Sequence, residues 1–499
     1  MVSLNKPSSN EFTRDELMTL AKSSLNEPAL DSLSQLYSSV KSSFDLPYGS
    51  LYSLDWITVD GLKTFRNVVT LDLTKNPVAI LFGPNGSGKT SIALSIHYSI
   101  CGMPALRRQK RSGSSFFSNR ALGDRWISIK SQFSRTWGSI KAIQIARMIR
   151  KRKTTRIDSL VPISSAESNS AALSQLNTWD PHNVVRTPEN VNSFVSRSLG
   201  VQHAELLDLS QLQFFHEKQN YILSRNYRKV RRNLILWASG LRSLARLHSE
   251  IKKQVGSKKT AIERIRRKSD EVQHLLGQAE KAQEGTELRN ESNLKAVLKN
   301  LDNSTRKDVV RALEQHFERL SIEIKELARQ FDEIKQIKSF LTDEMEQRSQ
   351  HFIDAINQHF EAVQVRIFDS KQALLHLGNL GKLIIAKRTK YDDFSKAEQK
   401  LLEVLFRLSF ISVSHHDRGF LVLETPSEDL DQEYKQLLVQ ELARFSRDGH
   451  RLICTETNPR FVQALKRQCS ATVVDLSEHA ALSATKLEQT SLDYFYEEV

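Results

Sequence analysis

The chain has 499 residues, of which 39% are hydrophobic and 26% charged, and its net charge is +14; this predicts a globular protein with more than one core and favours a polyanionic partner such as nucleic acid. No apolar stretch approaches the length of a membrane span, and the first residues carry no signal-peptide core, so we expect no membrane association and a cytoplasmic location. The cysteines, Cys101, Cys454 and Cys469, lack CxxC spacing, which excludes a disulfide framework and a cysteine zinc site.

Residues 1–50 are polar and serine-rich, and we expect them to form a helical extension with a packing or partner-contact role. The stretches EFTRDELMTLAK and ALDSLSQLYSSVKSSF are its candidate helices. From Leu51 the pattern changes, because residues 54–65 and 67–74 alternate between apolar and polar positions. This alternation predicts two strands in a hairpin that leads into the next buried strand.

A phosphate-binding loop is the strongest motif in the chain. The apolar run NPVAILF predicts a buried strand, the segment GPNGSGKT follows, and SIALSIHYSI resumes as a helix. Backbone N–H groups of such a loop surround an anion, the lysine reaches the β- and γ-phosphates, and the threonine hydroxyl is a ligand for Mg²⁺. We therefore predict that ATP and Mg²⁺ bind here. The expected nucleotide-binding residues are Gly83, Pro84, Asn85, Gly86, Ser87, Gly88, Lys89, Thr90 and Ser91.

A strongly basic segment with interleaved aromatic residues follows the loop helix. It either presents a face that contacts nucleic-acid phosphates or is a solvated strand face with a basic loop. The residues WISIKSQFS and SIKAIQIARMI within it predict strands. The candidate nucleic-acid contacts are Arg107, Arg108, Lys110, Arg111, Arg150, Lys151, Arg152 and Lys153.

Heptad-like apolar spacing dominates residues 236–365. Leu244, Ile251, Ile265 and Val272 share one heptad position, and a polar break at 285–293 separates this stretch from a more regular return helix. The pattern predicts an antiparallel coiled-coil hairpin with arms of about 40 residues, which at 1.5 Å per residue extend about 60 Å. A compact helical subdomain is the alternative.

Strand-and-helix character returns in residues 366–499. The strands FLVLE and RLICT are joined by the helix DQEYKQLLVQELARFSRD. Because strands alternate with helices on both sides of the hairpin, we expect residues 51–235 and 366–499 to build one α/β sheet.

This arrangement resembles the ABC-type ATPases of the SMC, RecF and double-strand-break repair class. The resemblance rests on GPNGSGKTS, on the preceding hairpin and on the motifs beyond the coiled coil, and does not cover residues 1–50. It implies an α/β P-loop NTPase head of ABC type built from both chain ends, with an inserted antiparallel coiled-coil hairpin. In that class two heads enclose ATP, so the resemblance also implies a head-to-head dimer.

The resemblance carries roles onto particular residues. FSKAEQK is similar to the signature loop that contacts ATP held by the partner head, with Ser395 and Glu398 matching and two glycines replaced. In FLVLETPSEDLD, Glu424 falls on the magnesium-linked acid, and Asp431 matches an aspartate that crosses the dimer. The residue that senses magnesium before the coiled coil is either Gln213 or His216, of which we take Gln213 as the metal-site candidate together with Thr90 and Glu424.

The departures from the pattern concern hydrolysis. Thr425 stands where the catalytic glutamate belongs, and Thr457 stands where the switch histidine belongs. Because a carboxylate must orient or deprotonate the attacking water, we expect weak ATP hydrolysis, with Glu424 or Glu428 as substitute catalytic residues.

Three functions fit these motifs. The first is an ATP-dependent, DNA-binding dimer that controls a separate effector protein such as a nuclease, similar to the ATPases of Septu-type or retron-associated anti-phage systems. The second is a DNA-repair or chromosome-maintenance ATPase. The third is a non-enzymatic scaffold that ATP stabilises and that assembles through its coiled coil.

Overall fold

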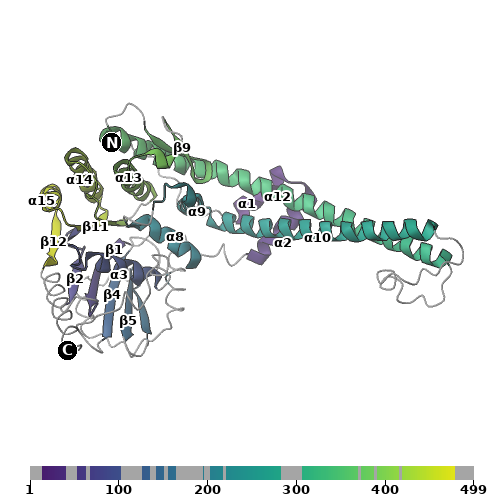
Figure 1. The fold of residues 1–499 in the computed structure, drawn as a ribbon, viewed down its shortest axis with the longest axis horizontal. Helices are drawn as coiled ribbons and strands as arrows, with labels where there is room; N and C mark the ends of the chain where they lie inside the picture. Colours follow the sequence, from purple (N-terminus) through teal and green to yellow (C-terminus); the bar gives the residue numbers. More distant parts are fainter. Residues whose placement is uncertain are drawn as a thin grey trace, which may run out of the picture. The chain divides into compact units, whose positions relative to one another are not determined.

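The computed structural model divides the chain into two compact units (Figure 1). One unit comprises residues 1–11, 46–240 and 348–499, and the other comprises residues 12–45 and 241–347. The residues that the structure describes are 14–40, 53–62, 68–102, 126–134, 142–150, 156–163, 195, 203–216, 221–281, 306–368, 373–386, 390–414 and 419–477.

A parallel five-stranded sheet forms the centre of the first unit. Its order is β12 (Ala471–Asp475), β3 (Val78–Phe82), β11 (Arg451–Glu456), β10 (Phe420–Glu424) and β7 (Phe214–Phe215). The apolar runs VAILF and FLVLE are almost wholly buried, as expected for parallel strands covered on both faces. Since β3 precedes the helical insertion and β10, β11 and β12 follow it, both chain ends build one sheet, which confirms the predicted fold.

A second, antiparallel sheet lies in the same unit. Its order is β2 (Val69–Asp72), β1 (Ser53–Asp60), β4 (Trp126–Ser134), β5 (Ala142–Arg150) and β6 (Arg156–Ile163). The predicted hairpin is present as β1 and β2, with Ile57 opposite Leu71. Asp55 of β1 forms a buried ion pair with Arg451 of β11 and accepts a hydrogen bond from Gln132 of β4. This buried pair connects the two sheets.

Helices pack around the parallel sheet. They are α3 (Lys89–Cys101), α8 (His203–Gln213), α9 (Arg228–Ala238), α13 (Lys396–Ser414), α14 (Gln432–Arg447) and α15 (Pro459–Gln468). Beside them lie a small hairpin of β8 (Leu375–Gly378) and β9 (Lys382–Ile385) and short 3-10 turns at Arg225–Tyr227, Asn379–Gly381 and Tyr391–Asp393. The last turns of α12 (Arg306–Phe368) also join this core through Phe352, Ile356 and Phe360.

The second unit contains the predicted helical hairpin. It is formed by α10 (Arg242–Lys281) and the first part of α12, which lie side by side in Figure 1. Ile265, Val272, Leu275 and Ala279 of α10 pack with Val309, Leu313 and Leu320 of α12. The heptad pattern therefore identified this element, because the apolar seam of each helix is buried against the other.

The N-terminal helices α1 (Arg14–Ser24) and α2 (Glu27–Val40) belong to the same unit as the hairpin. Leu17, Ala29 and Leu33 are fully buried, α2 packs against α10, and the Ser32 hydroxyl donates to Glu333 of α12 at 3.3 Å. We expected residues 1–50 to form a helical extension with a packing or partner-contact role, and in the structure α1 and α2 cover part of the coiled coil. None of the described helices is long and apolar enough to cross a membrane.

Candidate nucleotide site

The phosphate loop connects β3 to α3, as predicted. Gly88 has φ 94° and immediately precedes the first residue of α3, a left-handed conformation that favours glycine. The Lys89 ammonium donates to the carbonyls of Gly83 at 2.6 Å and Pro84 at 2.8 Å. Burial lowers the pKa of Lys89, and the carboxylates of Glu456 and Glu424 oppose this effect. The loop thus curls around a lysine positioned beside two acids.

Thr90 and Glu424 come together from opposite ends of the chain. The Thr90 hydroxyl donates to Glu424 Oε1 in a short hydrogen bond across a sequence separation of 334 residues. Thr90 lies in the first turn of α3, and Glu424 is the last residue of β10. The first is a hydroxyl ligand and the second an acidic ligand of the kind that Mg²⁺ uses in P-loop sites. The donor set therefore fits a divalent cation that takes further ligands from nucleotide phosphates.

His216 also contacts Glu424. Strand β7 runs parallel to β10 with Phe215 opposite Leu423, so the next residue of β7 lies beside the end of β10. The His216 Nδ1 atom is 3.2 Å from Glu424 Oε2, and the imidazole is buried. The ring is nearly parallel to that of Phe214, at 10° and a centroid distance of 6.4 Å. Of the two residues that the sequence left open, the structure brings His216 to the acidic edge of the site.

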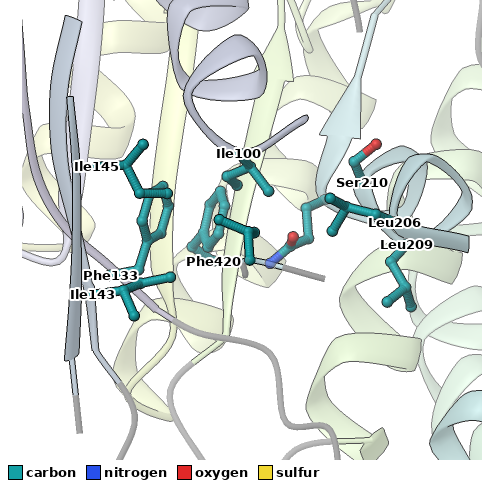
Figure 2. Close-up of a pocket in the computed structure, with 10 residues that line it drawn as sticks. Ile100, Phe133, Ile143, Ile145, Leu206, Leu209, Ser210 and Phe420 are labelled. Atoms are coloured by element: carbon teal, nitrogen blue, oxygen red, sulfur yellow. The ribbon is translucent and has the colours of Figure 1, made fainter. Parts of the chain in front are cut away.

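Gln213, the residue that we assigned to the metal site, instead lines a mainly apolar cavity (Figure 2). Phe133, Ile143 and Ile145 lie on one side of this cavity, with Leu206 and Leu209 of α8 on the other. Among the described residues, the Gln213 Nε2 atom is buried without a hydrogen-bond partner. Gln213 is the last residue of α8, and His216 follows the two residues of β7, Phe214 and Phe215. The two side chains therefore have different surroundings.

The turn after β10 carries Thr425, at the position where the resemblance implies a carboxylate. Thr425 has φ 44°, an unusual conformation for a β-branched residue, and its N–H donates to the Thr455 carbonyl at 2.9 Å. Glu428, the other candidate acid, is exposed, and its carbonyl accepts a hydrogen bond from Lys400. Glu424 is therefore the acid that directly contacts Thr90 of the phosphate loop, whereas Glu428 is exposed.

Glu456 is an acidic residue of the site that the sequence reasoning did not single out. It ends β11, the strand between β3 and β10, and is 1% exposed. Its carboxylate accepts hydrogen bonds from the N–H groups of Thr457 at 2.8 Å, Asn458 at 3.1 Å and Ser427 at 3.3 Å. A signal existed in the sequence, because RLICTE ends on an acid just as FLVLE does. Glu456 holds together the turns that follow β10 and β11.

The signature-like residues form a helix start. The Ser395 hydroxyl accepts from the Glu398 N–H at 3.2 Å, and the Glu398 carboxylate accepts from the Ser395 N–H at 2.7 Å. This reciprocal pair is a capping box that begins α13. Asp431 likewise caps α14 by accepting from the Tyr434 N–H at 2.8 Å. All three matched residues therefore cap helix N-termini within their own chain.

Arg407 of α13 contacts β7, the strand that leads to His216, and forms a buried ion pair within its own helix. Arg407 pairs with Glu403, and both side chains are 0% exposed. Burial raises the pKa of Glu403, although Arg407 and the Leu223 N–H oppose the shift. The Arg407 guanidinium lies 5.1 Å from the centre of the Phe215 ring. The helix that begins at the signature-like loop is thus packed directly onto β7.

Most of the predicted nucleic-acid contacts lie outside the described residues. This applies to Arg107, Arg108, Lys110, Arg111, Lys151, Arg152 and Lys153, and of Arg150 only the backbone is described. Within the described part of the chain, no cluster of three or more His, Cys, Asp and Glu side chains is arranged to hold a metal ion.

The chain is similar to known proteins in family and in fold. The family model AAA_23, described as an AAA domain, matches residues 57–368. The crystal structure of the Smc head domain with an extended coiled coil from Pyrococcus furiosus, bound to the C-terminal domain of ScpA, is similar at 13% identity and a TM-score of 0.47, over 88% of this chain and 99% of that chain. The Smc head domain with a coiled coil and joint from Pyrococcus yayanosii is similar at 11% identity and a TM-score of 0.46, over 85% and 95%. No curated protein matches the chain.

Proposed function

Because the chain belongs to the AAA_23 family of AAA domains, we propose that it is an ATP-binding head that dimerises around nucleotide and hydrolyses ATP slowly. The contact between Thr90 and Glu424 carries this proposal. It joins the hydroxyl of the phosphate loop to the acid of the opposite chain end, where one magnesium ion would bind both residues together with the phosphates of ATP. When bound, that ion would neutralise phosphate charge.

Slow hydrolysis is supported by the residues at the edge of the site. A threonine hydroxyl is a poor general base. Thr425 stands where the resembled family has its catalytic glutamate. Glu424 already contacts Thr90 and His216, which favours a role in holding the cation. The carboxylate of Glu456 is occupied by three backbone N–H groups. We therefore expect ATP to stay bound for a long time before it is hydrolysed.

Dimerisation is supported by the start of α13. The capping box of Ser395 and Glu398 leaves this helix N-terminus well formed. Helix N-termini favour anions because of their unpaired N–H groups and the helix dipole. We propose that this N-terminus approaches the γ-phosphate of ATP held by a second copy of the chain, and that Asp431 lies in the same interface.

Sedimentation velocity tests the dimer. With Mg²⁺ and a non-hydrolysable ATP analogue we expect the wild type to dimerise, whereas Lys89→Ala should remain monomeric. Ser395→Arg should bind the analogue but fail to dimerise, because a bulky charge would stand at the proposed contact. Ser257→Arg, at an exposed position of α10, is the matched control and should dimerise. Dimerisation of Ser395→Arg at wild-type affinity would overturn the proposed interface.

We also propose that the chain binds nucleic acid, with DNA favoured. Support comes from the net charge of +14 and from exposed basic side chains along α10. These are Lys252, Lys253, Lys259, Arg264, Arg266, Arg267 and Lys268. Charge reversal at residues 150–153, or at 264 and 266–268, should weaken DNA binding and reduce its salt dependence by about one unit of slope per lost phosphate contact. Affinity indifferent to salt and to both sets would favour the scaffold function.

The biological setting belongs to the same proposal. We favour a cytoplasmic ATPase that controls a separate effector, such as the nuclease of an anti-phage system, and DNA repair or chromosome maintenance is the alternative. Cys101, Cys454 and Cys469 form no disulfide with one another, which agrees with a reducing compartment. Copurification from the native host, followed by identification of the bound protein and nucleic acid, separates the two: an associated nuclease supports effector control, and DNA without such a partner supports maintenance.

A further inference from the structure

The nucleotide site contains a nitrogen donor where its other protein donors are oxygens. Thr90 offers a hydroxyl and Glu424 a carboxylate, whereas His216 brings an imidazole to the same carboxylate. The sequence pattern left this position open between an amide and an imidazole, and the structure places the imidazole there. This choice has a chemical consequence for the divalent cation, because oxygen and nitrogen donors select different metals.

His216 is held in place from two sides. The parallel pairing of β7 with β10 brings it beside the end of β10, and its ring lies in a stack with Phe214 and His97. The imidazole is 4% exposed, so solvent does not compete for it. Among the described residues, the His216 Nε2 atom has no hydrogen-bond partner, whereas its Nδ1 atom lies within hydrogen-bond distance of Glu424. The side chain is therefore both oriented and buried.

The separation of the two donors suits a shared cation. Nδ1 of His216 and Oε2 of Glu424 are 3.2 Å apart. Neighbouring ligands of an octahedral ion with bonds of 2.0–2.2 Å are separated by about 3 Å. A divalent cation bound here would be held by the Nδ1 lone pair of His216 and the carboxylate of Glu424, with the imidazole proton on Nε2.

We propose that His216 is a direct nitrogen ligand of the divalent cation bound with ATP, and that this ligand makes the site prefer Mn²⁺ or a later transition metal over Mg²⁺. Mg²⁺ strongly favours oxygen donors and retains its waters, whereas imidazole affinity rises along the series from Mn²⁺ to Cu²⁺. The inference rests on the proposed nucleotide site. It adds a metal preference that the phosphate loop alone does not predict.

Pulsed electron paramagnetic resonance of bound Mn²⁺ tests the ligand directly. The full chain would be labelled with ¹⁵N-histidine and loaded with Mn²⁺ and a non-hydrolysable ATP analogue, so that nitrogen from the adenine is distinguished from nitrogen of histidine. We expect a ¹⁵N coupling of the size given by a directly bonded imidazole. It should disappear in His216→Gln and persist in His97→Gln, a control that removes the other histidine of the stack.

Metal competition gives the second readout. We expect the ratio of Mn²⁺ to Mg²⁺ affinity in the nucleotide complex to fall about tenfold in His216→Gln, because the amide oxygen of glutamine replaces the nitrogen. Thermal unfolding and fluorescent ATP-analogue binding without metal verify that the variants fold and still hold nucleotide. Bound Mn²⁺ without a histidine coupling in the wild type would overturn the proposal and leave nucleotide binding intact. Absence of analogue binding by the wild type would instead overturn the nucleotide site itself, and this inference with it.

Discussion

The two edges of the nucleotide site differ in how closely they keep the expected pattern. The phosphate-loop edge, from Gly83 to Ser91, has every residue type that its motif requires. The opposite edge, at the ends of β10 and β11, has Thr425 and Thr457 at the positions where the family resemblance implies a carboxylate and an imidazole, and it adds the buried acid Glu456. Binding depends mainly on backbone N–H groups and one lysine, whereas hydrolysis depends on individual side chains. The fold can therefore keep the first function while the second weakens.

The largest effect should come from restoring the missing carboxylate. Thr425→Glu places an acid where the attacking water is expected and replaces a β-branched residue at a positive φ of 44°. General-base catalysis contributes about 10²- to 10⁴-fold, so we expect single-turnover hydrolysis to accelerate at least about 100-fold. Rapid-quench assays with radiolabelled ATP measure this. Glu433→Gln, at an exposed position of α14, is the control and should change the wild-type rate little.

Fast hydrolysis by the wild type, unchanged in Thr425→Glu, would remove the distinction between the two edges. It would mean that another group already orients the water. In that case Glu456→Gln and Glu424→Gln would identify which acid performs the role.

At the phosphate-loop edge, removal of Lys89 should abolish most nucleotide affinity. The Lys89 ammonium is buried within the loop and positioned for the phosphates. Because a charge-assisted hydrogen bond contributes about 1.5–3 kcal/mol, Lys89→Ala should weaken ATP binding about 30-fold. Isothermal titration calorimetry measures the change, with Lys75→Ala, an exposed lysine just before β3, as control. Equal affinity in Lys89→Ala and Lys75→Ala would show that nucleotide binds elsewhere.

Elements built from short stretches of the chain could be predicted from the sequence, but contacts between residues far apart in the sequence could not. The phosphate loop, the β1–β2 hairpin and the coiled coil are encoded by spacing within short windows. His216 reaches Glu424 because β7 pairs with β10 in one particular register across more than 200 residues, which no local pattern encodes. The packing of α1 and α2 on the coiled coil is of the same kind, since amphipathic helices do not specify which surface they cover.

Acid should destabilise the chain by protonating His450, which lies at the start of β11, at the end of the strand opposite to the nucleotide site. His450 precedes β11 and accepts a hydrogen bond from the Gly419 N–H; burial, assisted by nearby His359, lowers its pKa to about 4. The unfolded chain binds the proton near pH 6.5, so it takes up more protons than the folded chain as the pH falls from about 6.5 to about 4. We expect about 2 kcal/mol of stability to be lost between pH 7 and pH 5. Chemical denaturation at each pH measures it.

The His450→Gln variant is the comparison for acid unfolding. It should be less stable at pH 7 but should lose less stability between pH 7 and pH 5 than the wild type. A wild type whose stability does not fall over this range would contradict the buried, neutral imidazole.

The smallest expected effect concerns Glu456. Glu456→Gln keeps the shape but turns an amide N–H group toward backbone donors, so we expect a loss of about 1 kcal/mol in stability. ATP affinity should rise slightly, because a carboxylate beside Lys89 no longer repels the triphosphate. Thermal unfolding and calorimetry measure the two effects. A tenfold loss of Mg²⁺-dependent affinity would instead identify Glu456 as a ligand of the cation.

A double-mutant cycle on Thr90 and Glu424 tests the central claim most directly, namely that residues from the two ends of the chain share one cation. Affinity for Mg²⁺ and a non-hydrolysable ATP analogue would be measured for the wild type, Thr90→Ala, Glu424→Gln and the double variant. Because the two side chains are in contact, we predict that the effects are non-additive by at least about 1 kcal/mol. Effects that add within about 0.3 kcal/mol would contradict a single site built from both chain ends.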